Sequence, residues 1–125
     1  VSDHGGKFVW VFKIEEDGSL VYPQNYMTMR TPSTDPDVAK GDGMATDADG
    51  RYYVTSTEGL QMFDPTGRMG GVIAKPQDAG LVSAAFAGPD LAYLYVACGD
   101  KVYRRKTKTK GVLFFEQPKF DKAKR

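Results

Sequence analysis

Short hydrophobic runs, each ended by glycine, proline or aspartate, recur along most of the chain. The middle part predicts strands at about 43–46, 52–56, 60–63 and 69–73. The following part predicts strands at about 83–86, 94–97, 101–105 and 111–115. Strands spaced so closely leave no room for helices between them. The pattern therefore predicts an all-β fold of short strands joined by tight turns.

The first part of the chain follows a related pattern. Phe8 to Phe12 form an uninterrupted apolar run, which is typical of a strand buried on both faces. A turn at 15–19 separates this run from a second strand at 20–29, which Pro23 interrupts. The segment 31–37 is dense in helix and strand breakers and predicts a loop that leads to Gly41.

The strands repeat with a period of about 40 residues. Tyr53-Val54-Thr55 matches Tyr95-Val96-Ala97, and Val1-Ser2 takes the same place one unit earlier. The third strands align as Val11-Phe12, Met62-Phe63 and Val102-Tyr103. Four small strands in such a period are typical of one blade of a β-propeller. We therefore expect a propeller built from four-stranded antiparallel blades.

The repeat divides the chain into blades. We expect a partial blade and loop at 1–40, a complete blade at 41–80, a last blade at 81–115 and a basic tail at 116–125. About two and a half blades cannot close a ring, and a blade needs neighbours to cover both of its faces. The sequence thus predicts either the C-terminal portion of a longer propeller, which we favour, or several copies that cover one another.

Composition excludes several classes of protein. The chain has 125 residues and a net charge of +1, and its single cysteine, Cys98, allows no internal disulfide and fits a small strand-end residue. No apolar run approaches the roughly 20 residues that span a bilayer. Basic residues gather near the end, but the alternating Lys106 to Lys110 segment is typical of an exposed edge strand and lacks interleaved aromatics. We expect neither a nucleic acid nor a membrane as partner.

Two residues are candidates for chemistry. Asp42 lies between Gly41 and Gly43, where a carboxylate can hold a hard cation and accept a proton from bound water, although an aspartate between glycines is also a common turn residue. His4 could be a general base or a solvated residue of a glycine-rich turn. The segment Asp47 to Gly50 favours a hairpin turn over half of a calcium loop, because no further acids follow at the right spacing.

The run from Gly41 to Thr55 resembles the signature of the gluconolactonase-like family, which includes senescence marker protein and luciferin-regenerating enzyme. In that family an Asp-Gly-Met start is followed by Asp-x-x-Gly and an aromatic-Val strand. The likeness continues through Gly59 to Gly67, through Phe86 to Ala97, and into Cys98 to Lys106. Asp3 to Trp10 resembles the turn and third strand of an earlier blade.

The resemblance implies a six-bladed propeller with a divalent cation, usually calcium, in its central channel, which hydrolyses sugar lactones or related esters. Asp42 matches the family's aspartate that binds the metal and assists proton transfer. The glutamate and asparagine that complete the family's ligand set are expected upstream of Val1. Two departures are a lysine-glycine pair, Lys40-Gly41, in place of a proline before the aspartate, and Val82-Ser83 in place of a polar pair facing the channel.

Two functions remain open at this point. The chain can be the C-terminal portion of a calcium-dependent lactonase that acts on a small lactone or ester and is inactive alone because other metal ligands are missing. Alternatively it is a non-catalytic propeller scaffold or a self-assembling blade fragment, since a fold does not determine a chemistry. The resemblance favours an exported protein, periplasmic or secreted.

Overall fold

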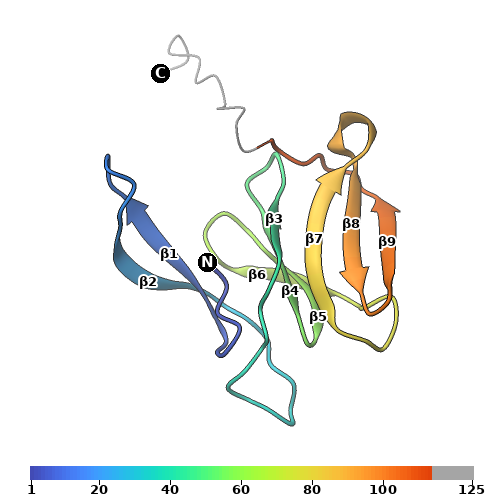
Figure 1. Ribbon diagram of the computed structural model, residues 1–125, viewed down its shortest axis with the longest axis horizontal. Helices are drawn as coiled ribbons and strands as arrows, with labels where there is room; N and C mark the ends of the chain where they lie inside the picture. The colour runs from blue at the N-terminus through green and yellow to red at the C-terminus, as the bar shows by residue number, and fades with distance from the viewer. Residues whose placement is uncertain (114–125) are drawn as a thin grey trace.

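The computed structural model describes residues 1–113, and their regular secondary structure is strand apart from one short 3-10 turn (Figure 1). The strands are β1 (Phe8–Ile14), β2 (Leu20–Thr28), β3 (Met44–Thr46), β4 (Tyr52–Ser56), β5 (Gly59–Phe63), β6 (Met69–Ile73), β7 (Leu81–Ala87), β8 (Tyr93–Cys98) and β9 (Lys101–Lys106). One short 3-10 turn, η1 (Pro89–Leu91), precedes β8. The expected all-β fold class is confirmed.

The strands form three antiparallel sheets in chain order. The first sheet pairs β1 with β2, the middle sheet has the order β3-β4-β5-β6, and the last sheet has the order β7-β8-β9. Figure 1 shows β7 beside β3 and β4, with the β1–β2 hairpin on the other side of the middle sheet. Each sheet is a meander, which is how one blade follows the next in a propeller.

The two outer hairpins of the middle sheet use the same turn. Gly50 donates its amide to the carbonyl of Asp47 at 3.0 Å, and Gly67 donates in the same way to Asp64 at 2.9 Å. Both glycines have positive φ, 79° and 86° respectively, which a side chain would disfavour. The Asp-x-x-Gly pattern therefore sets the loop length that fixes the register of these hairpins.

The first sheet has a third segment. Val1 exchanges both backbone hydrogen bonds with Trp10 at 2.8 Å, and Ser2 forms an isolated bridge with Val9. This confirms that Val1-Ser2 pairs with the strand that follows it. The interruption expected at Pro23 takes the form of an irregular register in β2, which nevertheless continues across the proline.

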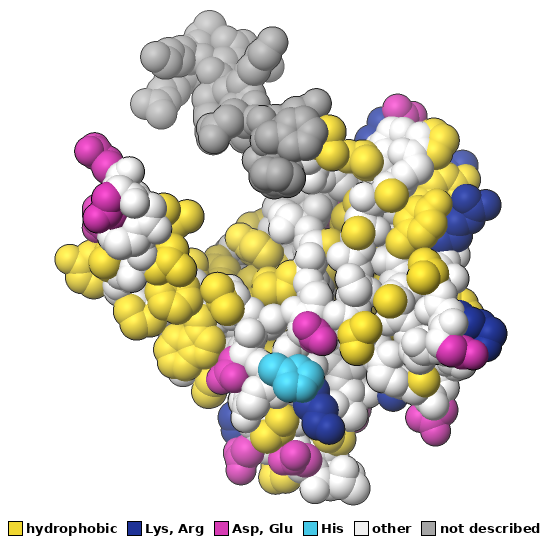
Figure 2. Space-filling view, viewed as in Figure 1, with side chains coloured by type: hydrophobic (Ala, Val, Ile, Leu, Met, Phe, Trp, Pro, Cys, Tyr) yellow, Lys and Arg dark blue, Asp and Glu magenta, His cyan; other side chains and the backbone are white. Residues whose placement is uncertain are grey.

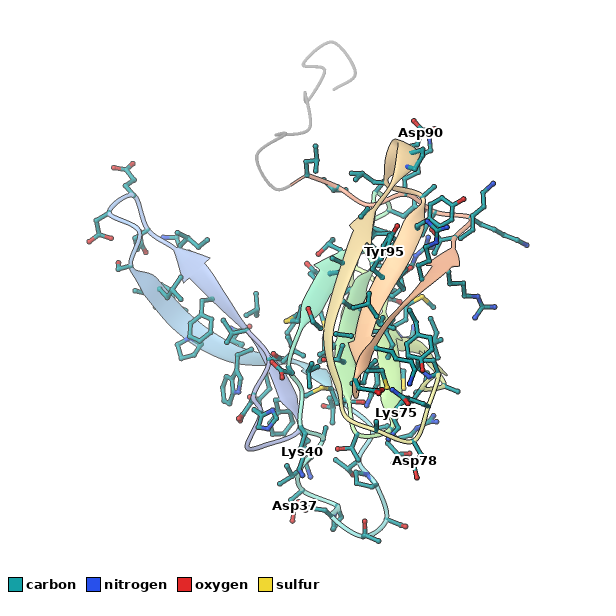
Figure 3. All side chains as sticks on the ribbon, turned by 45° about the vertical axis from the view of Figure 1, so that its right-hand side comes forward. Asp37, Lys40, Lys75, Asp78, Asp90 and Tyr95 are labelled. Atoms are coloured by element: carbon teal, nitrogen blue, oxygen red, sulfur yellow. The ribbon has the colours of Figure 1, made fainter. Side chains whose placement is uncertain are left out.

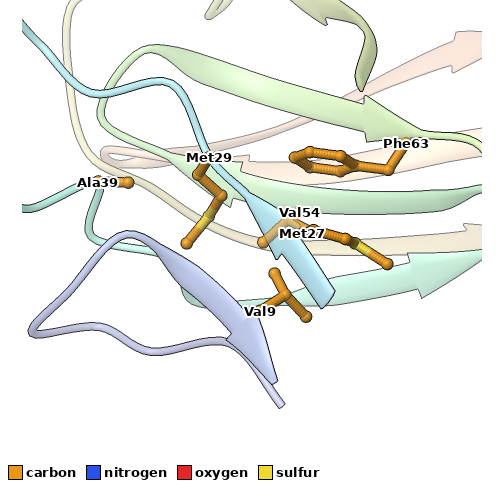
Figure 4. Close-up of a cluster of buried hydrophobic side chains, with 6 residues drawn as sticks. All are labelled: Val9, Met27, Met29, Ala39, Val54 and Phe63. Atoms are coloured by element: carbon orange, nitrogen blue, oxygen red, sulfur yellow. The ribbon is translucent and has the colours of Figure 1, made fainter. Parts of the chain in front are cut away.

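Two apolar clusters lie between the sheets. One joins the first and middle sheets and consists of the buried residues drawn in Figure 4, namely Val9, Met27, Met29, Ala39, Val54 and Phe63. The other joins the middle and last sheets and consists of Tyr53, Leu60, Leu81, Ala84, Leu94 and Cys98. Successive residues of β4 point to opposite faces, so Tyr53 belongs to one cluster and Val54 to the other. The middle sheet is therefore covered on both faces.

The expectation that Phe8 to Phe12 is buried on both faces is wrong. Only Val9 of β1 is buried, while Val11 is 39% and Ile14 is 71% exposed. The middle sheet covers one face of the hairpin, and no described residue covers the other. Burial of this strand on both faces requires a neighbour that residues 1–113 do not supply.

The strand expected at 111–115 is not formed by its first residues. Gly111 makes an isolated bridge to Asp47 in the middle sheet instead of extending the last sheet. After β9, the Thr107 amide donates a hydrogen bond to the Ala92 carbonyl at 2.8 Å. Further along the chain, the Lys110 carbonyl accepts a hydrogen bond from the Ala48 amide at 2.7 Å. These bonds carry the chain across to the middle sheet. Residues 114 and 115 lie outside the described residues.

Candidate functional site

Asp42 stands at the entrance to β3, and its main chain is held from two sides. Its amide donates to the Thr55 carbonyl at 3.2 Å, and its own carbonyl accepts a hydrogen bond from the Ser2 hydroxyl at 2.6 Å. The side chain is exposed. The carboxylate therefore projects from a fixed backbone, in which β4 and the first segment of the chain together set its position.

The two glycines beside Asp42 are closely packed, Gly43 against backbone and Gly41 against the end of the Met29 side chain. A Cβ on Gly43 would lie 2.6 Å from the Cα of Ser83, and one on Gly41 would lie 2.6 Å from the Met29 Cε. The Gly43 amide also donates to the Val82 carbonyl at 3.0 Å. Gly43 is thus the place where the backbones of the middle and last sheets touch, a packing contact that a simple turn would not require.

His4 lies in the turn that precedes β1 and is exposed. This turn is shaped by Asp3, whose amide donates to the Phe8 carbonyl and whose carboxylate accepts from the Gly5 amide, both at 3.0 Å. Within residues 1–113 no hydrogen bond joins His4 to Asp42. The structure therefore supplies no contact that would make the two residues an acid–base pair, and a role for His4 stays a prediction.

The described residues do not by themselves fit a calcium ion. Calcium takes six to eight oxygen ligands. Across residues 1–113 no group of three or more His, Cys, Asp or Glu residues is placed to hold a metal ion. Asp42 offers one carboxylate, so a complete site needs ligands from outside this set of residues.

The sequence reasoning missed a buried polar network around Asp47, which is only 1% exposed. One carboxylate oxygen accepts from Arg51 Nε at 2.7 Å and from the Tyr53 hydroxyl at 2.9 Å. The other oxygen accepts from the amides of Asp49 at 2.9 Å and Arg51 at 3.0 Å. The signal in the sequence was an arginine and a tyrosine at positions four and six after the aspartate.

The same network sets the pKa values of its members. Burial alone raises the pKa of Asp47, but the hydrogen bonds from Arg51, Tyr53 and Asp49 outweigh it and hold that pKa below its ordinary value. Burial and the nearby Asp47 carboxylate raise the pKa of the Tyr53 hydroxyl. Asp47 thus stays ionised inside the protein and locks the turn before β4, a structural task.

A second polar clamp ties the loop that carries Asp42 to the middle sheet. The buried Gln61 accepts a hydrogen bond from the Arg30 amide at 2.7 Å and donates to the Arg30 carbonyl and the Ser56 hydroxyl, both at 2.8 Å. This loop continues through Asp37 and Lys40, at the end of the molecule opposite Asp90 in Figure 3. The start of the loop that leads to Asp42 is therefore tied to β5.

Comparison with known proteins gives one family and two solved structures. Residues 1–99 match the model of the SMP-30/gluconolactonase/LRE-like region. A protein provisionally assigned as a gluconolactonase has a TM-score of 0.71 and 20% identity over 86% of this chain and 34% of its own length. Luciferin-regenerating enzyme has a TM-score of 0.73 and 21% identity over 89% of this chain and 42% of its own.

These matches also set the scale of the chain. It spans less than half the length of either solved structure. No curated protein sequence matches it. In the part of the chain that the structure describes, no helix is long and apolar enough to cross a membrane.

Proposed function

This chain belongs to the SMP-30/gluconolactonase/LRE-like family, and we propose that it is the part of a lactone- or ester-hydrolysing propeller that supplies Asp42. In this proposal Asp42 is one ligand of a divalent cation, calcium in the first instance, and other blades supply the remaining ligands. The substrate is a small sugar lactone or a related ester. The chain by itself is inactive.

The observation that carries this proposal is the way Asp42 is presented. An exposed carboxylate stands on a backbone that β4 and Ser2 hold, next to Gly43, which has no room for a side chain. A solvent-facing carboxylate on a fixed backbone suits a metal ligand, because a hard cation takes oxygen donors. When bound, such a cation polarises a carbonyl and acidifies a water molecule.

The test is hydrolysis of gluconolactone with and without added calcium, by the chain alone and by the polypeptide of its complete reading frame. We expect activity in the complete polypeptide and none in the 125-residue chain. Asp42→Asn should lower the activity of the complete polypeptide by roughly two orders of magnitude or more. Asp35→Asn, which changes an exposed aspartate on the preceding loop, is the matched control.

Two results would contradict the proposal. Turnover by the isolated chain that Asp42→Asn abolishes would show that the chain needs no further ligands. Unchanged turnover of the complete polypeptide after Asp42→Asn, with calcium binding also unchanged, would remove Asp42 from the site.

A scaffold role is favoured by one separate observation. The β1–β2 hairpin exposes Val11, Ile14, Leu20 and Tyr22, with exposed fractions of 39%, 71%, 53% and 72%, and the first three of them line a groove that faces the middle sheet. Figure 2 shows hydrophobic side chains gathered over the hairpin. Apolar surface of this kind marks an interaction face. A sedimentation profile that stays monomeric at rising protein concentration would count against self-assembly through this face.

A further inference from the structure

The middle and last sheets diverge away from the contact between β3 and β7 and leave a cleft of about 760 Å³. This volume falls within the roughly 300–1,000 Å³ of small-molecule sites. The cleft is bounded by β4, β5 and β6 on one side and by β8 and β9 on the other. It is therefore separate from the exposed carboxylate at the entrance to β3.

The floor of the cleft is apolar and comes from both sheets. Leu60, Met62 and Ile73 line it from the middle sheet, and Leu94, Val96 and Tyr103 line it from the last sheet. Leu60 and Leu94 are buried, whereas Met62, Ile73, Val96 and Tyr103 are only partly covered. The cleft can thus take an apolar body, because partly covered side chains would lose water contact when it enters.

One end of the cleft is cationic. Five basic residues line this end, from the turn before β4, from β9 and from the segment that follows β9: Arg51, Arg104, Arg105, Lys106 and Lys108. Among residues 1–113, no aspartate or glutamate lines the cleft. This end lies near Ala92, to whose carbonyl the Thr107 hydroxyl donates at 2.9 Å, and so on the η1 side of the last sheet. Asp42 lies beyond the opposite end of β3.

Arg51 and Arg105 differ in how far a nearby carboxylate already neutralises their charge. Arg51 pairs with Asp47 at 2.7 Å and with Asp49 at 2.9 Å. Arg105 lies directly opposite Leu94 in the β8–β9 ladder. Its side chain therefore projects from the same face of the last sheet as Leu94, which is the face that lines the cleft. Within residues 1–113 no carboxylate pairs with Arg105. Arg104 also lacks a carboxylate partner in residues 1–113, but it donates to the Tyr95 hydroxyl, and as the neighbour of Arg105 in β9 it projects from the other face of the sheet. Among the described arginines of the cleft, the Arg105 guanidinium is therefore the one without a carboxylate partner that projects from the cleft face.

We propose that this cleft binds an organic anion with an apolar body, of the fatty carboxylate class, whose carboxylate pairs with Arg105. The apolar chain lies between the facing sheets, over Leu60, Ile73 and Val96. Guanidinium and carboxylate form charge-assisted hydrogen bonds, and the fork of an arginine can make two of them at once. The basic residues at the rim favour a negatively charged ligand, and the apolar floor favours a ligand with a long hydrocarbon chain.

The first test is calorimetric titration of the chain with decanoate below its micelle concentration. We expect saturable binding of one decanoate per chain, which weakens as ionic strength rises because the pair is partly exposed. Octanoate should bind more weakly and dodecanoate more tightly, by about fourfold for each methylene buried. Decyltrimethylammonium, which has the same chain with the opposite charge, should not bind. Equal affinity for the two decyl probes would overturn the proposal.

A matched pair of variants tests the role of Arg105. Arg105→Gln should weaken decanoate binding by about tenfold, the loss expected for a hydrogen bond to a charged group. Arg104→Gln is the control, because the Arg104 guanidinium lies 5.3 Å from the centre of the Tyr93 ring and donates to the Tyr95 hydroxyl at 3.4 Å. Arg104 also lines the cleft, but it lies opposite Tyr95 in the β8–β9 ladder, whereas Arg105 lies opposite Leu94, so the two side chains project from opposite faces of the sheet. Arg104→Gln should therefore leave the affinity for decanoate unchanged. Equal effects of the two variants would contradict the assignment.

The position of the ligand has its own measurement. In nuclear magnetic resonance spectra, decanoate should shift the methyl signals of Leu60 and Ile73, which line the cleft. The methyl signals of Val11 and Ile14, which line the smaller groove between the first and middle sheets, should stay in place. Shifts confined to Val11 and Ile14 would place the anion on the hairpin and overturn the proposal.

Discussion

The middle sheet and the β1–β2 hairpin are related by the sequence repeat but differ in burial. In the middle sheet Phe63 is fully buried, whereas the matching Phe12 of β1 is only partly covered. Both strands carry the same kind of apolar residues. The difference lies in their neighbours, because sheets flank the middle sheet on both faces and cover the hairpin on one. The burial of a propeller strand therefore depends on the sheets that pack against it as well as on its own residues.

The largest effect should come from truncating these two equivalent aromatic residues. Phe63→Ala removes a buried ring from the core and should lower the free energy of unfolding by about 3–5 kcal/mol. Phe12→Ala should lower it by roughly 1–2 kcal/mol, because part of that ring is already in water. Urea denaturation of both variants measures the difference. Equal losses would show that the hairpin is as well packed as the middle sheet.

Next in size are two glycine substitutions that probe the contact between sheets. Gly43→Ala places a methyl group 2.6 Å from the Ser83 backbone and should destabilise the protein by about 1–3 kcal/mol. At Gly71 an added Cβ meets no atom within 4 Å, so Gly71→Ala should be neutral or stabilise by about 0.4–1 kcal/mol. Thermal unfolding followed by circular dichroism separates the two. A Gly43→Ala variant as stable as wild type would mean that the sheets can move apart freely.

The two Asp-x-x-Gly turns allow a third comparison within the middle sheet. Asp47→Asn should lower the free energy of unfolding by about 1–3 kcal/mol, because Arg51 and Tyr53 lose a buried charged partner. Asp64→Asn changes the corresponding residue of the solvated turn, whose carboxylate accepts from Thr66 and Arg68, and should have a smaller effect. Chemical denaturation at neutral pH measures both.

The Asp47 effect should depend on pH in a defined direction. The folded protein holds the pKa of Asp47 below its ordinary value. The contribution of ionised Asp47 to stability is therefore fully present above its pKa in the unfolded chain, about 3.9. It is lost as the pH falls through the pKa of Asp47 in the folded protein. The stability difference between wild type and Asp47→Asn should shrink below about pH 4. A difference that grows in acid would contradict the direction of the shift.

The smallest change in stability should come from an exposed apolar side chain of the hairpin. Ile14 is 71% exposed, so Ile14→Lys should alter the free energy of unfolding by no more than about 0.5 kcal/mol. It should nevertheless reduce self-association in analytical ultracentrifugation. Val102→Lys, at an equally exposed position on β9, is the control and should leave association unchanged. Loss of association in both variants would place the contact elsewhere.

The sequence predicted those parts of the fold that local patterns control. The strands of the middle sheet match their expected positions to within one residue at each end, because an Asp-x-x-Gly turn or a glycine bounds each of them. The pairing of Val1-Ser2 with the next strand also followed from the repeat. The burial of Phe8 to Phe12 was wrong because it depends on a second neighbour. The strand expected to begin at Gly111 was wrong because long-range hydrogen bonds to Ala92 and Ala48 redirect the chain.

The candidate site was predictable to a different degree. The motif identified Asp42, and the structure adds that Gly43 beside it is needed where the middle and last sheets meet. The ionised network of Asp47 was missed, because nothing in the turn pattern indicates that one aspartate is buried and the other solvated. The Asp47 turn is covered by the segment at Lys110 and by Tyr53, which only the folded chain brings together.

The close approach at Gly43 has a consequence for the geometry of a ring. The backbones of the middle and last sheets touch at this glycine, while the same sheets are separated by the cleft near β6 and β9. The two sheets therefore enclose a wedge whose angle is set by atom size at its narrow end. A larger residue at position 43 would push the narrow end apart and reduce the angle, and a ring made of narrower wedges needs more of them to close. The absence of one side chain thus helps to determine how many blades complete a circle.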